Sequence, residues 1–290
     1  MEPPNTSKSE HPTTYFMADR ANEQELLRLI AQDQILTAGI GGVLPEFPDT
    51  TAFRCILDVG CGTGGWLFQA AQTYPTMTRL VGVDLNPKMI KYAREQVIAQ
   101  QLSGRLDFYI MDALRMLEFP DTTFDLVNMR QGGSFLRTWD WPQILQEFLR
   151  VTHHKGTLRI VETDLVSEST SPAFNQLSML LVRAFHLSGH YFTAEQNGLI
   201  NQLPRMLRQA GLNDVQTQRY DAEYRADTPE GQLFIEDMRY VLENMQPFVQ
   251  KWVRVPQYEA LRQQAMEELH QPGFSAHWGV VTAWGKKIMR

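Results

Sequence analysis

Short apolar runs alternate with helix-like segments through the middle of this 290-residue chain. The runs are the length of strands, and the segments between them carry apolar positions at helical spacing. Strands are predicted over 54–59, 79–84, 106–111, 124–129 and 157–163. Helices are predicted over 64–73, 87–101, 112–117 and 140–152. Strands that alternate with helices predict a parallel sheet with helices on both faces.

The flanks of this core are less regular. Residues 1–13 are polar and contain three prolines, so we expect a disordered tail there. An amphipathic helix is predicted over 22–38, ended by the glycines that follow it. Beyond residue 165, helices are predicted over 172–188, 195–210, 229–252 and 256–269, and strands over 215–220 and 277–286. We find no internal repeat and no linker, which favours one domain over 14–290.

Composition narrows the class of protein. The net charge of −6, without a block of like charge, counts against a nucleic-acid partner, because such binders usually carry a basic face. The two cysteines, Cys55 and Cys61, are too few for a disulfide framework and fit the reducing cytoplasm. There is no signal-peptide pattern and no apolar run near the ~18 residues of a membrane span, so we expect no membrane association.

The most informative segment is 56–65, where a buried strand runs into a glycine turn. Two patterns overlap there: G-x-G-x-x-G over Gly60, Gly62 and Gly65, and G-x-G-x-G over Gly60, Gly62 and Gly64. The first is the dinucleotide pattern, so glycine spacing alone does not identify the ligand. Asp58 does, because a carboxylate at the end of the strand would repel a pyrophosphate and attract a cation. S-adenosylmethionine carries an ammonium and a sulfonium and has no phosphate.

Acids also close the next two predicted strands. Asp84 ends the second strand, where a carboxylate can accept from both ribose hydroxyls, although an NAD enzyme would place an acid similarly. Asp112 follows the third strand and can accept from the adenine amino group. Together with the fourth strand, 124–130, these motifs resemble the class I S-adenosylmethionine-dependent methyltransferases over residues 55–165.

The resemblance implies a complete fold. We expect an α/β domain with a doubly wound, seven-stranded, mostly parallel sheet (Rossmann-like), whose last strand runs antiparallel between strands five and six. The segments 166–195 and 226–272 would be insertions that build a helical lid over the core of residues 54–165. The helix over 22–38 would close over cofactor and substrate. The run that precedes the core, which includes Tyr15 and Glu25, is similar to the lead-in of methyltransferases of secondary metabolism, including a fungal regulator type.

The resemblance also implies a cofactor site for S-adenosylmethionine. Its predicted residues are Asp58, Gly60, Cys61, Gly62, Gly64, Asp84, Leu85, Met89, Asp112, Ala113, Met129 and Arg130. Leu85 and Met89 would flank the adenine, and Asp112 with Ala113 would hold its edge. Met129 and Arg130 would border the sulfonium end, although Arg130 could instead hold a substrate carboxylate or pair with an acid of the cap.

The residues after the fourth strand restrict the chemistry. The stretch 128–131, Asn-Met-Arg-Gln, replaces the Asn/Asp-Pro-Pro-aromatic motif of enzymes that methylate amino groups of bases or of glutamine. Neither a catalytic cysteine nor a cluster of acids follows this strand, which counts against a pyrimidine C5 mechanism and predicts no metal. The candidates for a general base are His186, His190, Tyr191 and Glu162. The two histidines would share one helix face, although ordinary structural histidines or a zinc pair are alternatives.

Aromatic residues are plentiful in the segments predicted to form the lid, and they suit an apolar or aromatic acceptor. They are Tyr15, Phe16, Trp139, Trp141, Phe174, Phe185, Tyr191, Phe192 and Trp278. We therefore predict methyl transfer to a small organic acceptor, first of all to an oxygen of an aromatic or apolar metabolite. The alternatives are an RNA or protein methyltransferase and a non-catalytic regulator that binds the cofactor. The sequence leaves a homo-oligomer open.

Overall fold

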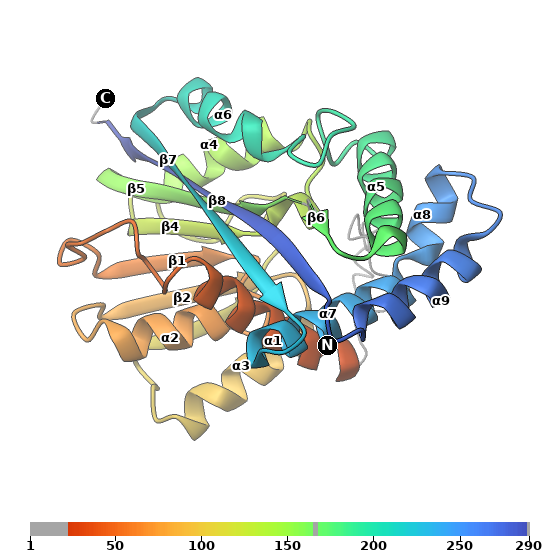
Figure 1. Ribbon diagram of the computed structural model, residues 1–290. Coiled ribbons are helices and arrows are strands. Elements are labelled where there is room, and N and C mark those ends of the chain that lie inside the picture. Colours follow the sequence, from red (N-terminus) through yellow and green to blue (C-terminus); the bar gives the residue numbers. More distant parts are fainter. Residues whose placement is uncertain (1–22, 165–167, 289–290) are drawn as a thin grey trace, which may run out of the picture.

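An eight-stranded sheet forms the centre of the protein (Figure 1). The computed structural model describes residues 23–164 and 168–288. The strands are β1 (Cys55–Val59), β2 (Arg79–Asp84), β3 (Leu106–Ile110), β4 (Phe124–Arg130), β5 (Thr152–Thr163), β6 (Glu168–Ser169), β7 (Leu212–Arg225) and β8 (Ser275–Lys287). Their order is β3-β2-β1-β4-β5-β8-β6, with β7 also paired to β8. The predicted tail 1–13 and the aromatic residues Tyr15 and Phe16 lie outside the described residues.

The sheet has the predicted mixed topology. Strands β1 to β5 pair in parallel, whereas β8 runs antiparallel between β5 and β7. The central strands are buried on both faces, which explains why they are continuous apolar runs rather than alternating patterns. Seven long strands match the prediction, and the two-residue β6 adds a short eighth one beside the start of β8. Strand β7 is longer than the predicted 215–220.

Nine α-helices surround the sheet in the described ranges. They are α1 (Glu23–Gly39), α2 (Gly65–Thr73), α3 (Pro87–Ala99), α4 (Trp141–Val151), α5 (Pro172–Leu187), α6 (Leu203–Ala210), α7 (Pro229–Asn244), α8 (Gln246–Trp252) and α9 (Tyr258–Leu269), with 3₁₀ turns η1 (Gly132–Ser134) and η2 (Ile200–Gln202). Side chains of α2 and α3 pack on one face of the sheet and those of α4 and α6 on the other. The doubly wound arrangement places ligands outside the carboxyl ends of β1 to β5.

Three predicted helices differ from the structure. Residues 112–117 form turns instead of a helix, because the Asp112 carboxylate accepts from the Leu114 amide at 2.9 Å in a local turn. The predicted helix 229–252 divides after Asn244, because Pro247 has no N–H to continue the helical bonds. The predicted helix 195–210 becomes α-helical only at Leu203, next to Pro204 in its first turn.

A group of helices lies beside the carboxyl ends of the strands. In Figure 1, α5, α8 and α9 stand together at one end of the sheet, and α7 runs from them toward α1. Helix α5 packs against α8 and α9, and α1 packs against α7. We call α1, α5, α7, α8 and α9 the cap. None of the helices in the described ranges combines the length and apolarity needed to cross a bilayer.

Candidate functional site

A cavity of about 310 Å³ lies between the carboxyl ends of the strands and the cap. Loops after β1, β2, β3 and β4 form one side of it, and α1, α5 and α7 form the other. The sequence-predicted residues that line it are Gly60, Cys61, Gly62, Asp84, Leu85, Met89, Asp112, Ala113, Arg130, Glu162 and Tyr191. The structure therefore gathers most predicted cofactor residues and two of the base candidates around one space.

The glycine turn after β1 contains glycines with different structural roles. Gly62 has a φ of 53°, and a Cβ built there would meet nothing within 4 Å, so its bare backbone faces the cavity. Gly64 lies outside the lining, and a Cβ there would strike the ring of Phe108. Of these two glycines, Gly62 leaves room for a ligand and Gly64 leaves room for the packing of Phe108.

Asp84 organises the edge of the cavity at the end of β2. Its Oδ2 accepts from the Gly62 amide at 2.9 Å, and its Oδ1 accepts from the Asn86 amide at 2.7 Å. One carboxylate thus holds the loops after β1 and β2 together. Since each carboxylate oxygen can accept more than one hydrogen bond, this does not prevent Asp84 from accepting ligand hydroxyls.

Asp58 lies beneath the turn and is only 2% exposed, so it does not line the cavity. Asn128 Nδ2 donates to its Oδ1 at 2.7 Å, and Arg159 Nη1 donates to Asn128 Oδ1 at 2.8 Å. Arg159 is also paired with Glu46 at 2.9 Å. Burial raises the pKa of Asp58 to about 6, against the opposing charge of Arg130. Asp58 was predicted to contact the cofactor, but in the structure its carboxylate is buried against Asn128 and does not reach the cavity. Met129 is likewise buried below the cavity.

The two histidine candidates lie outside the cavity lining. Helix α5 ends at Leu187 and Gly189 adopts a left-handed conformation, so His186 and His190 do not share a helix face as predicted. The His186 ring is exposed, with Nδ1 3.2 Å from the Tyr191 carbonyl oxygen. The His190 ring is buried, with Nδ1 2.8 Å from Ser188 Oγ. Among the described residues, no group of three His, Cys, Asp or Glu side chains could hold a metal ion.

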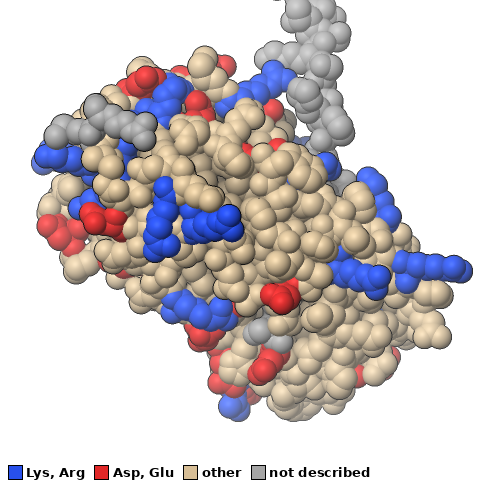
Figure 2. Space-filling view, turned by 90° about the horizontal axis from the view of Figure 1, so that it is seen from above, with Lys and Arg blue, Asp and Glu red and all other residues tan. Residues whose placement is uncertain are grey.

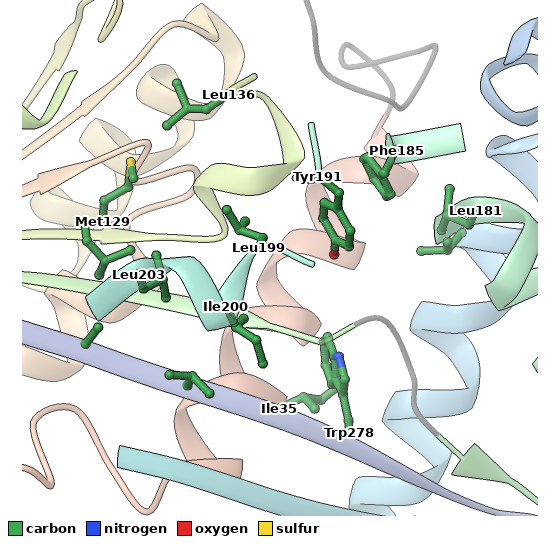
Figure 3. Close-up of a cluster of buried hydrophobic side chains, with 14 of the residues drawn as sticks. Ile35, Met129, Leu136, Leu181, Phe185, Tyr191, Leu199, Ile200, Leu203 and Trp278 are labelled. Atoms are coloured by element: carbon green, nitrogen blue, oxygen red, sulfur yellow. The ribbon is translucent and has the colours of Figure 1, made fainter. Parts of the chain in front are cut away.

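Glu162 and Tyr191 are the base candidates that line the cavity. Glu162 lies near the end of β5, where both of its carboxylate oxygens are 3.2 Å from the Gly133 amide nitrogen. Burial raises the pKa of Glu162 to about 8, while these amide contacts oppose the rise. Tyr191 stacks on Phe185 with ring centroids 5.2 Å apart, and burial raises its pKa. Figure 3 shows the Tyr191 hydroxyl pointing away from Phe185, on the side of Trp278.

Helix α1 brings charged groups to the cavity that were not predicted from the sequence. Arg28 is paired with Glu25 at 2.8 Å and with Asp237 of α7 at 2.9 Å, and all three side chains are buried. Asp33, also on α1, is paired with Arg130 of β4. The three-residue spacing of Glu25 and Arg28 is visible in the sequence. Asp237 and Arg130, which pair with Arg28 and Asp33, are far away in the sequence. The leucine at position 27, by contrast, is 60% exposed.

These residues fit the cofactor predicted from the sequence. Acids line the cavity, which favours a ligand with ammonium and sulfonium groups. The bare backbone at Gly62 leaves space for close approach. The buried Nε of Arg130 has no hydrogen-bond partner among the described residues, so a cationic donor is available beside these acids.

Comparisons with known proteins point to methyltransferases. A family model described as "Methyltransferase domain" matches residues 56–156. The demethylmenaquinone methyltransferase of Lactiplantibacillus plantarum is 30% identical over 176 residues, which cover 57% of this chain and 73% of that protein. Its counterpart from Shouchella clausii is 29% identical over 186 residues, covering 59% and 76%.

Solved structures show the same fold. Phosphoethanolamine N-methyltransferase 2 of Haemonchus contortus, in complex with S-adenosyl-L-methionine, superposes with a TM-score of 0.51 at 19% identity over 89% of this chain. This chain spans about half of that protein, 53% of its length. The [4+2]-cyclase SpnF superposes with a TM-score of 0.51 at 20% identity, over 96% of this chain and 88% of that one. Site, family model and relatives together assign the chain to the class I S-adenosylmethionine-dependent methyltransferases, with S-adenosylmethionine as its cofactor.

Proposed function

We propose that this enzyme transfers a methyl group to an oxygen of a small aromatic or apolar molecule. The observation that carries the proposal is the wall of the cavity that the cap provides. Its residues are Phe174, Leu181, Phe185, Tyr191, Met238, Val241, Leu242, Met245 and Trp278. A wall of this kind favours an apolar ligand held by a few polar groups.

The relatives support a small acceptor. The two bacterial relatives described above are named as demethylmenaquinone methyltransferases. Other relatives are named as N-methyltransferases of phosphoethanolamine and of ajmaline. A cytoplasmic location and a role in secondary metabolism also belong to this proposal. The free thiols of Cys55 and Cys61 support the first of these, because they fit a reducing compartment.

Glu162 is the group that we propose as general base. S-adenosylmethionine supplies an electrophilic methyl group on a sulfonium. The Glu162 carboxylate would accept the hydroxyl proton of the acceptor as its oxygen is methylated, with S-adenosylhomocysteine as the other product. Tyr191, which faces the same cavity, would orient the acceptor by a hydrogen bond. The cap would exclude water from the reacting atoms.

The face of the molecule shown in Figure 2 supports a small acceptor over RNA. On the face shown in Figure 2, acidic and basic side chains are interspersed around a broad area that carries neither. The described residues of that face form no continuous basic stripe. RNA-binding surfaces concentrate Lys and Arg along the path of the backbone.

The test is a panel of acceptors incubated with the enzyme and S-adenosylmethionine labelled on the methyl group. Each phenol is paired with its methyl ether, which has no free hydroxyl, and with the corresponding aniline, which presents nitrogen instead. Labelled ethers from phenols alone, identified by mass spectrometry, would support the proposal. Label that enters only RNA or protein would contradict it. Cofactor binding by calorimetry without any labelled product would favour a regulator.

A further inference from the structure

Gln131, the first residue after β4, holds a backbone conformation that is costly for its residue type. Its φ is 58°, in the left-handed region that favours glycine. Three hydrogen bonds keep it there. Its amide donates to the Val161 carbonyl oxygen at 2.8 Å, and its carbonyl oxygen accepts from the amide and the hydroxyl of Ser134 at 3.1 and 2.7 Å. Strained residues of this kind are concentrated at binding and active sites, and Gln131 lines the cavity.

We propose that Gln131 is a specificity-determining residue that binds the acceptor molecule. Its side-chain amide donates a hydrogen bond to a carbonyl oxygen next to the hydroxyl group that is methylated. This assignment rests on the proposed transfer to oxygen with Glu162 as the base. It narrows the acceptor to molecules that carry a hydroxyl and a neighbouring carbonyl group, of which ortho-hydroxyaryl ketones are a simple example.

The side-chain amide of Gln131 has one engaged end and one that lacks a partner. Its Oε1 accepts from Thr163 Oγ1 at 3.2 Å, which orients the amide group. Its Nε2 is buried and has no hydrogen-bond partner among the described residues. A buried donor without a partner is destabilising, so a ligand that accepts from it gains affinity. Because the last torsion of a glutamine side chain is soft, the N–H group can turn toward a ligand in the cavity.

Gln131 lies beside Glu162, the proposed base. The register of β4 and β5 places the two residues at neighbouring strand ends, about 5 Å apart. The turn that begins at Gln131 also holds the Glu162 carboxylate, because a Cβ built at Gly132 or Gly133 would lie 3.1 or 3.2 Å from its oxygens. A molecule whose hydroxyl contacts Glu162 therefore brings its neighbouring atoms to Gln131.

The chemistry of the transfer requires two different oxygens. The hydroxyl oxygen gives its proton to Glu162 and uses an electron pair to bond to the methyl carbon. A hydrogen bond donated to that oxygen would compete for the electron pair, so the N–H group of Gln131 suits a second oxygen of the same molecule. A carbonyl oxygen accepts hydrogen bonds and donates none, which matches this donor. A hydrocarbon group at the same position leaves the donor unpaired and weakens binding.

The experiment measures binding of three phenols by calorimetry to protein saturated with S-adenosylhomocysteine. The first probe is ortho-hydroxyacetophenone. The second is ortho-isopropenylphenol, in which a methylene group replaces the carbonyl oxygen, and the third is para-hydroxyacetophenone, in which the two groups are apart. We expect the wild type to bind the first probe about tenfold more tightly than the other two, because only it accepts from Gln131. In Gln131→Met this preference should disappear.

The controls separate recognition of the acceptor from damage to the fold. Gln101 is an exposed glutamine with nearly the same backbone conformation, φ 57°, so Gln101→Met carries the same conformational cost and should keep the preference. Gln131→Glu preserves the size of the side chain and an oxygen for Thr163 but removes the donor, and it should lose the preference as well. All three variants should bind S-adenosylhomocysteine within about twofold of the wild type.

Two results would overturn the assignment. One is a wild type that binds the three phenols alike, and the other is a Gln131 variant that keeps the preference for ortho-hydroxyacetophenone. Neither result involves methyl transfer, so the outcome does not depend on which atom is methylated. The panel of labelled acceptors tests that question separately.

Discussion

The two walls of the cavity are built in different ways. The wall that we propose for the cofactor comes from the loops after consecutive strands, and its contacts join residues close in sequence. Asp84 accepts from the amides of Asn86 and of Gly62, the latter 22 residues away. The cap wall comes from segments that are far apart in the sequence, and its contacts join them. Arg28, for example, donates to Asp237, which lies 209 residues away in the sequence. The first wall follows from how a parallel sheet ends, whereas the second follows from how side chains pack.

Because the two walls are built from different segments, we expect one to determine cofactor binding and the other to determine acceptor binding. Changes in the loops after β1 and β2 should alter cofactor binding whatever the acceptor is. Changes in the apolar residues of α5 and α7 should alter the acceptor and spare the cofactor. Effects at separated sites usually add, so the two kinds of change can be measured independently.

Glu162 lies where the walls meet, and its substitution should have the largest effect. We expect Glu162→Gln to lower kcat about a hundredfold or more, because a general base contributes at least that much. In the wild type, kcat/KM should rise with pH through about 8, where the Glu162 carboxyl loses its proton. In the variant this rise should be absent, as measured by initial rates from pH 6 to pH 9.

The control for this change is Glu168→Gln, which makes the same substitution at an exposed position of β6. It should leave the pH profile unchanged. If Glu162→Gln keeps most of the wild-type rate and its pH profile, Glu162 is not the base.

Asp84 tests the cofactor wall on its own. Asp84→Ala removes the carboxylate that joins the loops after β1 and β2, together with the proposed acceptor of the ribose hydroxyls. We expect the affinity for S-adenosylhomocysteine to fall about a hundredfold by calorimetry, since at least one charge-assisted bond is lost. Asp107→Ala, an exposed acid on β3, is the matched control. A loss no greater than that of the control would remove Asp84 from the site.

The cofactor wall could be predicted from the sequence because its signals are local. An apolar run predicts a buried strand, and an acid at the end of a strand predicts a carboxylate at the ligand edge. Asp84 and Asp112 accordingly line the cavity. Asp58 shows the limit of this reasoning: it ends a strand too, but Asn128 and Arg159 hold it below the turn.

The cap wall could not be predicted in the same way. Nothing local to Asp237 shows that Arg28 will contact it, because helix packing decides which residues meet. The four-residue spacing of His186 and His190 predicts that both lie on one face of a helix. Helix α5 ends at Leu187, however, three residues before His190. Asp33 lies in a helix whose apolar positions are recognisable, yet its partners are the start of α2 and the end of β4.

Phe185 tests the cap wall with a smaller effect. It lines the cavity from α5 and stacks on Tyr191. We expect Phe185→Ala to raise KM for an aromatic acceptor about tenfold, because part of an apolar contact is lost. The affinity for S-adenosylhomocysteine should stay within about twofold. Leu187→Ala, on the same helix but 47% exposed, is the control. An equal loss of cofactor affinity would contradict the independence of the two walls.

The smallest expected effect is a change in thermal stability. It tests whether water is excluded from Glu162, where the two walls meet. The Glu162 pKa is raised from 4.5 to about 8 in the folded protein, so its contribution to stability is complete below pH 4.5 and is lost as pH rises to 8. A glutamine side chain does not titrate, so Glu162→Gln should gain a few degrees in Tm over the wild type between pH 5 and pH 8. Asp58, whose pKa is raised to about 6, is common to both proteins and cancels. A Tm difference that is constant with pH would show that water reaches Glu162, and the cap would then not exclude solvent from the base.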